Sequence, residues 1–137
     1  MVVCMILNTT TNGDGPTLIL LHGLFGAAKN LGALARGLGA QARVISMDLR
    51  NHGESPHGAA MDFATMAADV AETMHSLGLP QASIVGHSLG GKTAMALALT
   101  QPQLVERQRR SCCCGAGAHI ALCCGCSHLQ GAEHAGG

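Results

Sequence analysis

Short apolar runs alternate with stretches of helical spacing over the first hundred residues of the chain. Three runs have the continuous apolar pattern of strands buried on both faces of a parallel sheet, at 17–21, 43–48 and 82–86. The stretches between and after them predict helices at 31–39, 62–79 and 90–102. Strands that alternate with helices in this way form strand–helix–strand units. The sequence therefore predicts an α/β fold, with a mostly parallel sheet and helices on both of its faces.

The helix at 62–79 has the clearest predicted boundaries. Asp62 is a favourable N-cap residue, and Gly78 with Pro80 is a typical stop signal. Apolar side chains recur between these ends at helical spacing, at Phe63, Met66, Ala67, Val70, Met74 and Leu77. This helix is expected to lay one apolar face on the sheet.

The pattern changes at Arg107. Residues 107–137 hold six of the seven cysteines and a single β-branched residue, Ile120, without strand or helix periodicity. We therefore divide the chain into a partial α/β core at 1–106 and a Cys/Gly/Ala/Arg-rich tail at 107–137. The tail is expected to be disordered or non-native and to add no strand to the sheet. A frameshift or truncation near Glu106 would explain the change.

Composition narrows the function classes. The net formal charge is zero, charged residues make up 12% and aromatic residues 1% of the chain, which argues against a nucleic-acid partner. No apolar stretch approaches the roughly 20 residues of a membrane span, and the N-terminus lacks the basic region of a signal peptide. We expect a cytoplasmic protein with no membrane span and no metal or other cofactor. The pattern favours no particular oligomeric state.

One motif carries chemistry. Residues 86–90 read Gly-His-Ser-Leu-Gly, which is the Gly-x-Ser-x-Gly pattern of a nucleophile elbow, between a predicted strand and a predicted helix. The flanking glycines let the backbone crowd together, and the serine hydroxyl stands at a helix N-terminus, where negative charge is stabilised. Ser88 is the predicted nucleophile, and His87 is expected to pack or form a hydrogen bond within the elbow.

A second loop is predicted to complete an oxyanion hole. His22 and Gly23 follow the first predicted strand, as supporting residues of the loop. The hole would combine the backbone N–H of Leu89 with that of Leu24, or of Phe25 as the second choice. Such donors bind the negative oxygen of a tetrahedral intermediate.

Three segments together resemble one family. "LILLHGLFGAAKNLGALARGL", "VISMDLRNHGESP" and "IVGHSLGGKTAMALAL" are similar to the α/β-hydrolase superfamily, and within it to the YbfF-type and abhydrolase-domain-11-like esterases, over residues 8–106. The resemblance implies a carboxyl-ester hydrolase that acts on a small-molecule acyl ester or thioester. It also implies that Asp48, Arg50, Asn51 and His52 shape the loop beside the site.

Several of these polar residues also have non-catalytic interpretations. Asp48 and Arg50 are expected to form an ion pair or to brace the loop, and His52 and His57 to be solvated loop residues. His75 lies late on the helix at 62–79, where a positive charge suits the helix dipole. Lys92 matches the family pattern without a role that its position explains.

The catalytic triad is not complete in the sequence. In this fold the acid and the histidine follow the serine along the chain, and no Asp occurs after residue 69. The downstream acids are Glu106 and Glu133, and the downstream histidines are His119, His128 and His134, all in the tail. We assign neither triad partner and expect an inactive form of the hydrolase.

Two alternatives remain open at this point. One is a catalytically silent scaffold with the same fold. The other is a metal-binding tail, since cysteine and histidine ligate Zn²⁺ or Cu⁺. The adjacent cysteines of "CCC" and "CCGC" argue against it, because closed zinc sites use pairs spaced by two to four residues. A Rossmann dinucleotide site is excluded, because no G-x-G-x-x-G follows the first strand.

Overall fold

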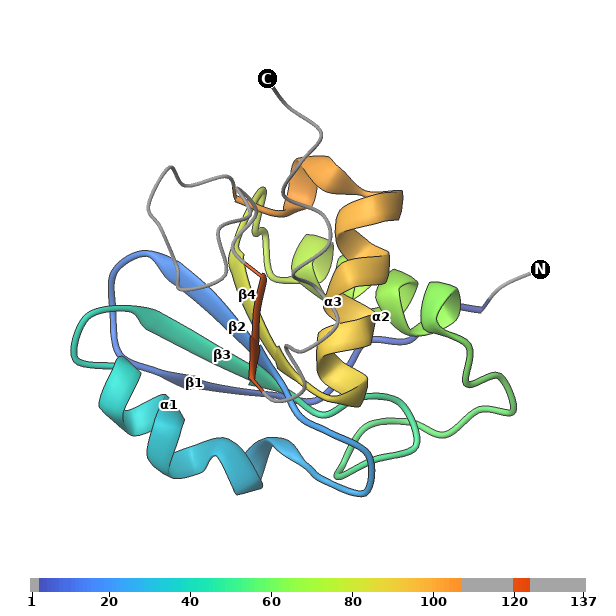
Figure 1. Cartoon of the computed structure of the whole chain (residues 1–137), viewed down its shortest axis with the longest axis horizontal. Helices are drawn as coiled ribbons and strands as arrows, with labels where there is room; N and C mark the ends of the chain where they lie inside the picture. Colours follow the sequence, from blue (N-terminus) through green and yellow to red (C-terminus); the bar gives the residue numbers. More distant parts are fainter. Residues whose placement is uncertain (1–2, 107–119, 124–137) are drawn as a thin grey trace, which may run out of the picture.

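A five-stranded sheet forms the centre of the molecule in the computed structural model, which describes residues 3–106 and 120–123 (Figure 1). Its strands are β1 (Thr9–Asn12), β2 (Thr17–Leu21), β3 (Arg43–Met47), β4 (Ser83–His87) and β5 (Ile120–Cys123). They lie in the order β1-β3-β2-β4-β5. Every neighbouring pair is parallel except β1 and β3, which run antiparallel. The predicted mostly parallel sheet is therefore confirmed.

Helices cover both faces of this sheet, as predicted. Figure 1 shows α1 (Gly32–Leu38) on one face and both α2 (Phe63–Ser76) and α3 (Leu89–Thr100) on the other. Two short 3-10 helices, η1 (Ala28–Leu31) and η2 (Pro102–Leu104), precede α1 and follow α3. The chain thus forms three layers, with the sheet in the middle.

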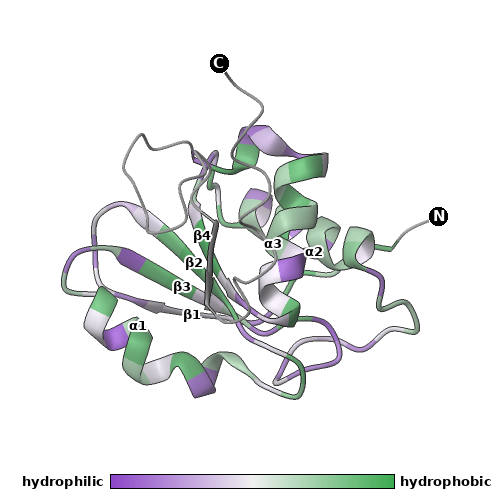
Figure 2. Cartoon of the chain, in the orientation of Figure 1, coloured by the Kyte–Doolittle hydropathy of each residue, from purple (hydrophilic) through white to green (hydrophobic). Residues whose placement is uncertain are grey.

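The alternation of side chains along the strands separates two apolar clusters. Ile19 and Leu21 of β2 point to the α2 and α3 side, where they join a large cluster in which neither is exposed. Leu20, between them, packs on the opposite face with Val44 and Ala35 of α1. Figure 2 shows apolar colouring along the central strands and along α3. This period of two explains why the strands read as unbroken apolar runs.

Helix α2 begins where the sequence predicts. The Asp62 carboxylate accepts hydrogen bonds from the Thr65 N–H at 2.8 Å and from the Thr65 hydroxyl at 2.7 Å. Met66, Val70 and Met74 have no exposed surface, and each contributes about 1.5–3 kcal/mol through burial. The helix ends at Ser76, just before Gly78, whose φ of 70° favours glycine.

Two strands differ from the sequence prediction. Strand β1, of sequence TTTN, was not expected, because it is polar, short and paired only along one edge. The expectation that residues 107–137 add no strand is wrong for Ile120–Cys123, which pairs in parallel with β4 as β5. The rest of that tail lies outside the described residues. A single parallel bridge also joins Ala82 to Val105.

Candidate active site

Ser88 occupies the turn that joins β4 to α3. It is exposed and has φ 50° and ψ −108°, a left-handed backbone that non-glycine residues rarely adopt. The predicted strand–turn–helix context of this serine is therefore confirmed. Holding such a residue costs on the order of 1–3 kcal/mol and is characteristic of functional turns.

Two glycines make this turn possible. A Cβ at Gly90 would collide with the backbone oxygens of Leu21 and His22, and one at Gly86 would collide with the Gly90 backbone. Both positions are buried. The start of α3 is thereby pressed against the end of β2, so the Ser88 turn and the loop after β2 lie next to each other.

An open pocket of about 340 Å³ lies between these two segments. It brings together most of the residues that the sequence singled out, and it is lined by His22, Gly23, Leu24, Phe25, Gly26, Asn30, Leu31, His87 and Ser88. Leu24 is 54% exposed and Phe25 92% exposed, so the mouth of the pocket has an apolar side. Leu89 does not line it. Its side chain packs on the core, and its N–H belongs to the first residue of α3.

The loop after β2, residues 22–27, has a defined backbone. The Gly26 N–H donates to the Gly23 carbonyl at 3.0 Å, and Phe25 has a left-handed φ of 60°. The Phe25 N–H donates to His52 Nε2 at 3.1 Å. Among the described residues, nothing accepts a hydrogen bond from the Leu24 N–H. Of the two predicted loop donors, Leu24 is therefore the one that stays available.

His22 and His52 link this loop to the loop after β3. The Leu49 N–H donates to His22 Nε2 at 2.9 Å, and the other ring nitrogen, Nδ1, lies 2.7 Å from the Gly23 carbonyl. His52 likewise has Nδ1 2.8 Å from the Arg50 carbonyl. Because a backbone N–H must donate, each Nε2 is an acceptor and each Nδ1 carries the proton, so both rings are neutral.

The burial of these rings corrects one expectation. His52 is 9% exposed and His22 1% exposed, with ring centroids 5.0 Å apart, so His52 is not a solvated loop residue. Burial lowers the pKa of His22. His57 is exposed, as predicted, and so is His75. A polar residue in a Gly-containing loop gives no sequence signal of burial, which is why the sequence predicts exposure for His52.

Asp48 braces the same two loops. Its carboxylate accepts from the Ala28 N–H at 2.7 Å, the Asn8 side-chain amide at 2.9 Å and the Glu54 N–H at 3.1 Å. Burial raises the pKa of Asp48, but these hydrogen bonds outweigh it and the pKa is lowered overall. A Cβ at Gly53 would collide with this carboxylate. Asp48 is therefore an ionised loop brace, as the sequence suggested.

Arg50 forms an ion pair, but not with Asp48. Its Nε and Nη2 donate to the two carboxylate oxygens of Asp69, on α2, at 2.6 and 2.9 Å. Both side chains are at most 3% exposed. Asn51 closes the loop locally, since its amide exchanges hydrogen bonds with the Gly58 backbone at 2.9 and 2.8 Å. All four residues that the resemblance assigned to this loop thus have structural contacts.

Two further residues flank the pocket. His87 is exposed and lies next to Gly23, where a Cβ would come within 2.8 Å of the imidazole Cδ2, so it contacts the loop after β2. The Lys92 ammonium lies 5.9 Å from the centroid of the Phe63 ring, a cation–π contact that links α3 to the start of α2. This contact gives Lys92 a structural role that its sequence position did not suggest.

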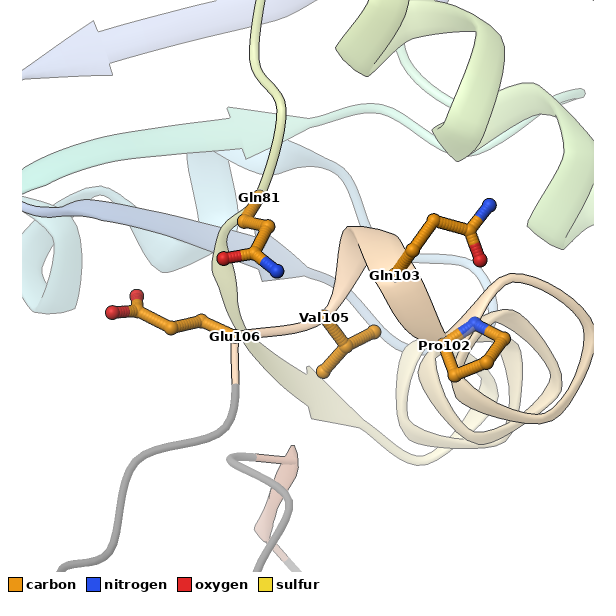
Figure 3. A pocket seen from close by; sticks show the side chains of 5 residues that line it. All are labelled: Gln81, Pro102, Gln103, Val105 and Glu106. Carbon is orange, nitrogen blue, oxygen red and sulfur yellow. The ribbon is translucent and has the colours of Figure 1, made fainter.

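Glu106 lies beside the start of β4, whereas Ser88 follows the end of the same strand. Its N–H donates to the Ala82 carbonyl at 2.9 Å, and its carboxylate accepts from the Ser83 hydroxyl at 3.4 Å. Ser83 begins β4 and Ser88 follows its end, a separation of about 17 Å at ~3.3 Å per residue. A hollow of about 430 Å³ lies there and is lined in part by Glu106. Figure 3 shows the Glu106 side chain pointing away from Pro102 and Gln103. This end of a parallel sheet does not normally hold the active site.

Two features are absent from the described part of the chain. Residues 3–106 and 120–123 contain no group of three or more His, Cys, Asp or Glu side chains that could hold a metal ion. The same residues include no helix that is long and apolar enough to cross a membrane. The downstream histidines His119, His128 and His134 and the acid Glu133 lie outside the described residues.

Comparisons with known proteins agree with this architecture. The model of the alpha/beta hydrolase fold family matches residues 16–107. An sn-1-specific diacylglycerol lipase, ABHD11 of Xenopus tropicalis, is 48% identical over 98 residues, covering 70% of this chain and 31% of the lipase. Esterase YbfF of Escherichia coli K12 is 40% identical over 90 residues, covering 66% of this chain and 35% of the esterase.

A solved structure gives the same result. A marine microorganism esterase superposes with a TM-score of 0.73 and 38% identity, covering 75% of this chain and 40% of that one. The chain spans about a third of the length of the curated relatives that it matches. The resemblance to YbfF-type and abhydrolase-domain-11-like esterases is confirmed. The chain belongs to the α/β-hydrolase fold family.

Proposed function

We propose that the pocket at Ser88 is the nucleophile and oxyanion half of a serine ester hydrolase. The Ser88 hydroxyl oxygen would attack the carbonyl carbon of an acyl ester, its proton would pass through water to the departing alcohol oxygen, and the carbonyl electrons would move onto the carbonyl oxygen. Collapse of this intermediate expels the alcohol, and water then releases the acid from the acyl-serine. The observation that carries the proposal is the left-handed Ser88 at the start of α3, facing the same pocket as the loop after β2.

The oxyanion would be bound by the backbone N–H groups of Leu24 and Leu89. The availability of the Leu24 N–H and the position of Leu89 as the first residue of α3 support this pair. The N-terminal end of α3 adds a favourable partial positive charge. Removal of one such donor typically costs about 10²–10³ in kcat, so these two groups would supply much of the rate.

The substrate class follows from the surroundings of the pocket. Leu24, Phe25 and Leu31 give it an apolar side, and Asn30 is the polar side chain nearest to them in sequence among the lining residues. A small-molecule acyl ester or thioester, with its acyl chain against the apolar side, fits this arrangement. The lipase and the esterases to which the chain is similar support an ester rather than an amide.

We further propose that this chain turns esters over far more slowly than a complete triad enzyme. A serine hydroxyl is a poor nucleophile without an adjacent base. Between Ser88 and Glu106 the chain contains no histidine, and Glu106 lies at the opposite end of β4 from Ser88. In triad enzymes that have lost a member, about 10³–10⁴-fold acceleration over water remains from the oxyanion hole and binding.

Slow covalent labelling tests the half-site. The full chain is incubated with an alkyl fluorophosphonate, and the modified peptide is identified by mass spectrometry. We expect an adduct at Ser88 over hours, which Ser88→Ala abolishes and Ser83→Ala, a serine at the other end of β4, leaves unchanged. Adducts spread evenly over several serines would overturn the proposed nucleophile.

A burst experiment tests the proposed inactivity. Rapid mixing with p-nitrophenyl butyrate should release no stoichiometric burst of p-nitrophenol. A burst of one equivalent that disappears in Ser88→Ala would show that the chain has a working base, and the inactivity proposal would be wrong. The nucleophile proposal would then be strengthened, so the two outcomes are separable.

A further inference from the structure

We propose that His52 is a positioning residue that holds the loop after β2 in place and leaves its Leu24 N–H as the donor for the oxyanion. This inference rests on the proposed function of the Ser88 pocket. His52 itself does not line the pocket, and its imidazole would act through the backbone of Phe25.

The loop is anchored to its neighbour at three points. His22 Nε2 accepts from the Leu49 N–H at the start of the loop, and Asp48 accepts from the Ala28 N–H at its end. His52 Nε2 accepts from the Phe25 N–H between these two points, at 3.1 Å. The first two anchors fix the ends, so His52 is the anchor nearest to Leu24.

Among the residues that the structure describes, the bond to His52 is the only hydrogen bond that ties Phe25 to the protein outside its own loop. The Phe25 φ of 60° is unfavourable for a side chain of this size, and the residue is 92% exposed, so packing does not compensate. The Gly26 N–H to Gly23 carbonyl bond joins two residues of the loop itself and gives no hold on the rest of the protein. Within the described part of the chain, the hydrogen bond to His52 is therefore the contact that favours this backbone.

His52 is in turn held rigidly. Its Nδ1 lies 2.8 Å from the Arg50 carbonyl, and Arg50 is locked to Asp69 by two hydrogen bonds. The ring is 9% exposed and lies beside the His22 ring. A fixed acceptor of this kind determines which backbone N–H of the loop is engaged in a hydrogen bond. By taking that of Phe25, His52 turns the adjacent Leu24 N–H into the available donor.

Amide hydrogen exchange on the full chain tests the hold on the loop. The Phe25 amide should be protected in the wild type and exchange at least tenfold faster in His52→Leu. His52→Gln keeps an acceptor oxygen near the Nε2 position and should restore most of the protection. His57→Leu, at an exposed histidine of the same loop, is the matched control and should change nothing.

The labelling rate of Ser88 tests the consequence for the reaction. His52→Leu should slow fluorophosphonate labelling by about 10- to 100-fold, since a small misplacement of a donor costs this much, and His52→Gln should recover most of the rate. If the Phe25 amide exchanged at the same rate in the wild type and in all variants, the proposal that His52 holds the loop would be wrong. Faster exchange with unchanged labelling would reduce His52 to a structural residue. No labelling of wild-type Ser88 would overturn the proposed function and the reaction part of this inference, while exchange still decides whether His52 holds the loop.

Discussion

Gly90 shows how much of the Ser88 turn depends on a missing side chain. A Cβ there would collide with two backbone oxygens, those of Leu21 and His22. Neither oxygen can move without disturbing the C-terminal end of β2. We expect Gly90→Ala to lower the free energy of unfolding by about 1–3 kcal/mol, as overpacking does. It should also abolish labelling of Ser88. Urea denaturation and mass spectrometry measure the two effects.

A second glycine provides the control for this substitution. Gly37 lies within α1, and a Cβ there would have no atom within 4 Å. Gly37→Ala should raise stability by up to about 1 kcal/mol, because alanine favours a helix. If both variants behaved alike, the crowding at the Ser88 turn would not be the reason for Gly90.

His22 makes the stability of the fold sensitive to mild acid. Burial lowers the pKa of His22 below 6.5, so the unfolded chain binds this proton first as the pH falls. The contribution of neutral His22 is therefore full above about pH 6.5 and is lost progressively below it. The melting temperature should fall in this range. Because the pKa of Asp48 lies below 3.8, the loss from that carboxylate begins only at lower pH.

The glutamine variant isolates the histidine. His22→Gln can still accept from the Leu49 N–H but does not titrate, so its melting temperature should change less than that of the wild type between pH 6.5 and pH 4. Subtracting the two profiles removes the contributions of the other histidines. Parallel profiles would show that His22 does not cause the acid sensitivity.

At the scale of elements, one buried ion pair joins α2 to the loop after β3. Asp69→Asn would leave the Arg50 guanidinium buried without a countercharge, because both side chains are at most 3% exposed. We expect a loss of about 3–5 kcal/mol, the usual effect of breaking a buried pair from one side. Glu72→Gln, at an exposed acid of the same helix, should stay within about 0.5 kcal/mol. Urea midpoints compare them, and equal midpoints would contradict a stabilising pair.

The elements that the sequence predicted share a local signal. Each could be located from its own residues. Strands β2 and β3 are apolar runs, and helix α2 has apolar residues at helical spacing together with its Asp62 cap. Strand β1 could not, because TTTN owes its pairing to β3 rather than to apolar content. The same holds at the site. The Ser88 turn follows from five consecutive residues, whereas the pairing of Arg50 with Asp69 and the burial of His52 depend on tertiary contacts.

At the scale of the whole molecule, sheet topology decides which groups can assist Ser88. The C-terminal ends of the parallel strands β2, β3 and β4 lie side by side, and the residues that follow them are His22, Asp48 and Ser88. Glu106 lies at the other end of the strands, beside the start of β4. A triad acid must reach a histidine that touches the nucleophile, and a separation of about 17 Å along β4 prevents this.

The resulting prediction uses two variants. Glu106→Gln should leave the rate of Ser88 labelling within twofold of the wild type, and so should the combined His119→Ala, His128→Ala and His134→Ala substitution. Gly37→Ala, where the added Cβ meets no atom within 4 Å, serves as the reference for handling. A fall of tenfold or more in the triple variant would show that a tail histidine activates Ser88. The proposed half-site would then be a complete one, with its base supplied from residues 107–137.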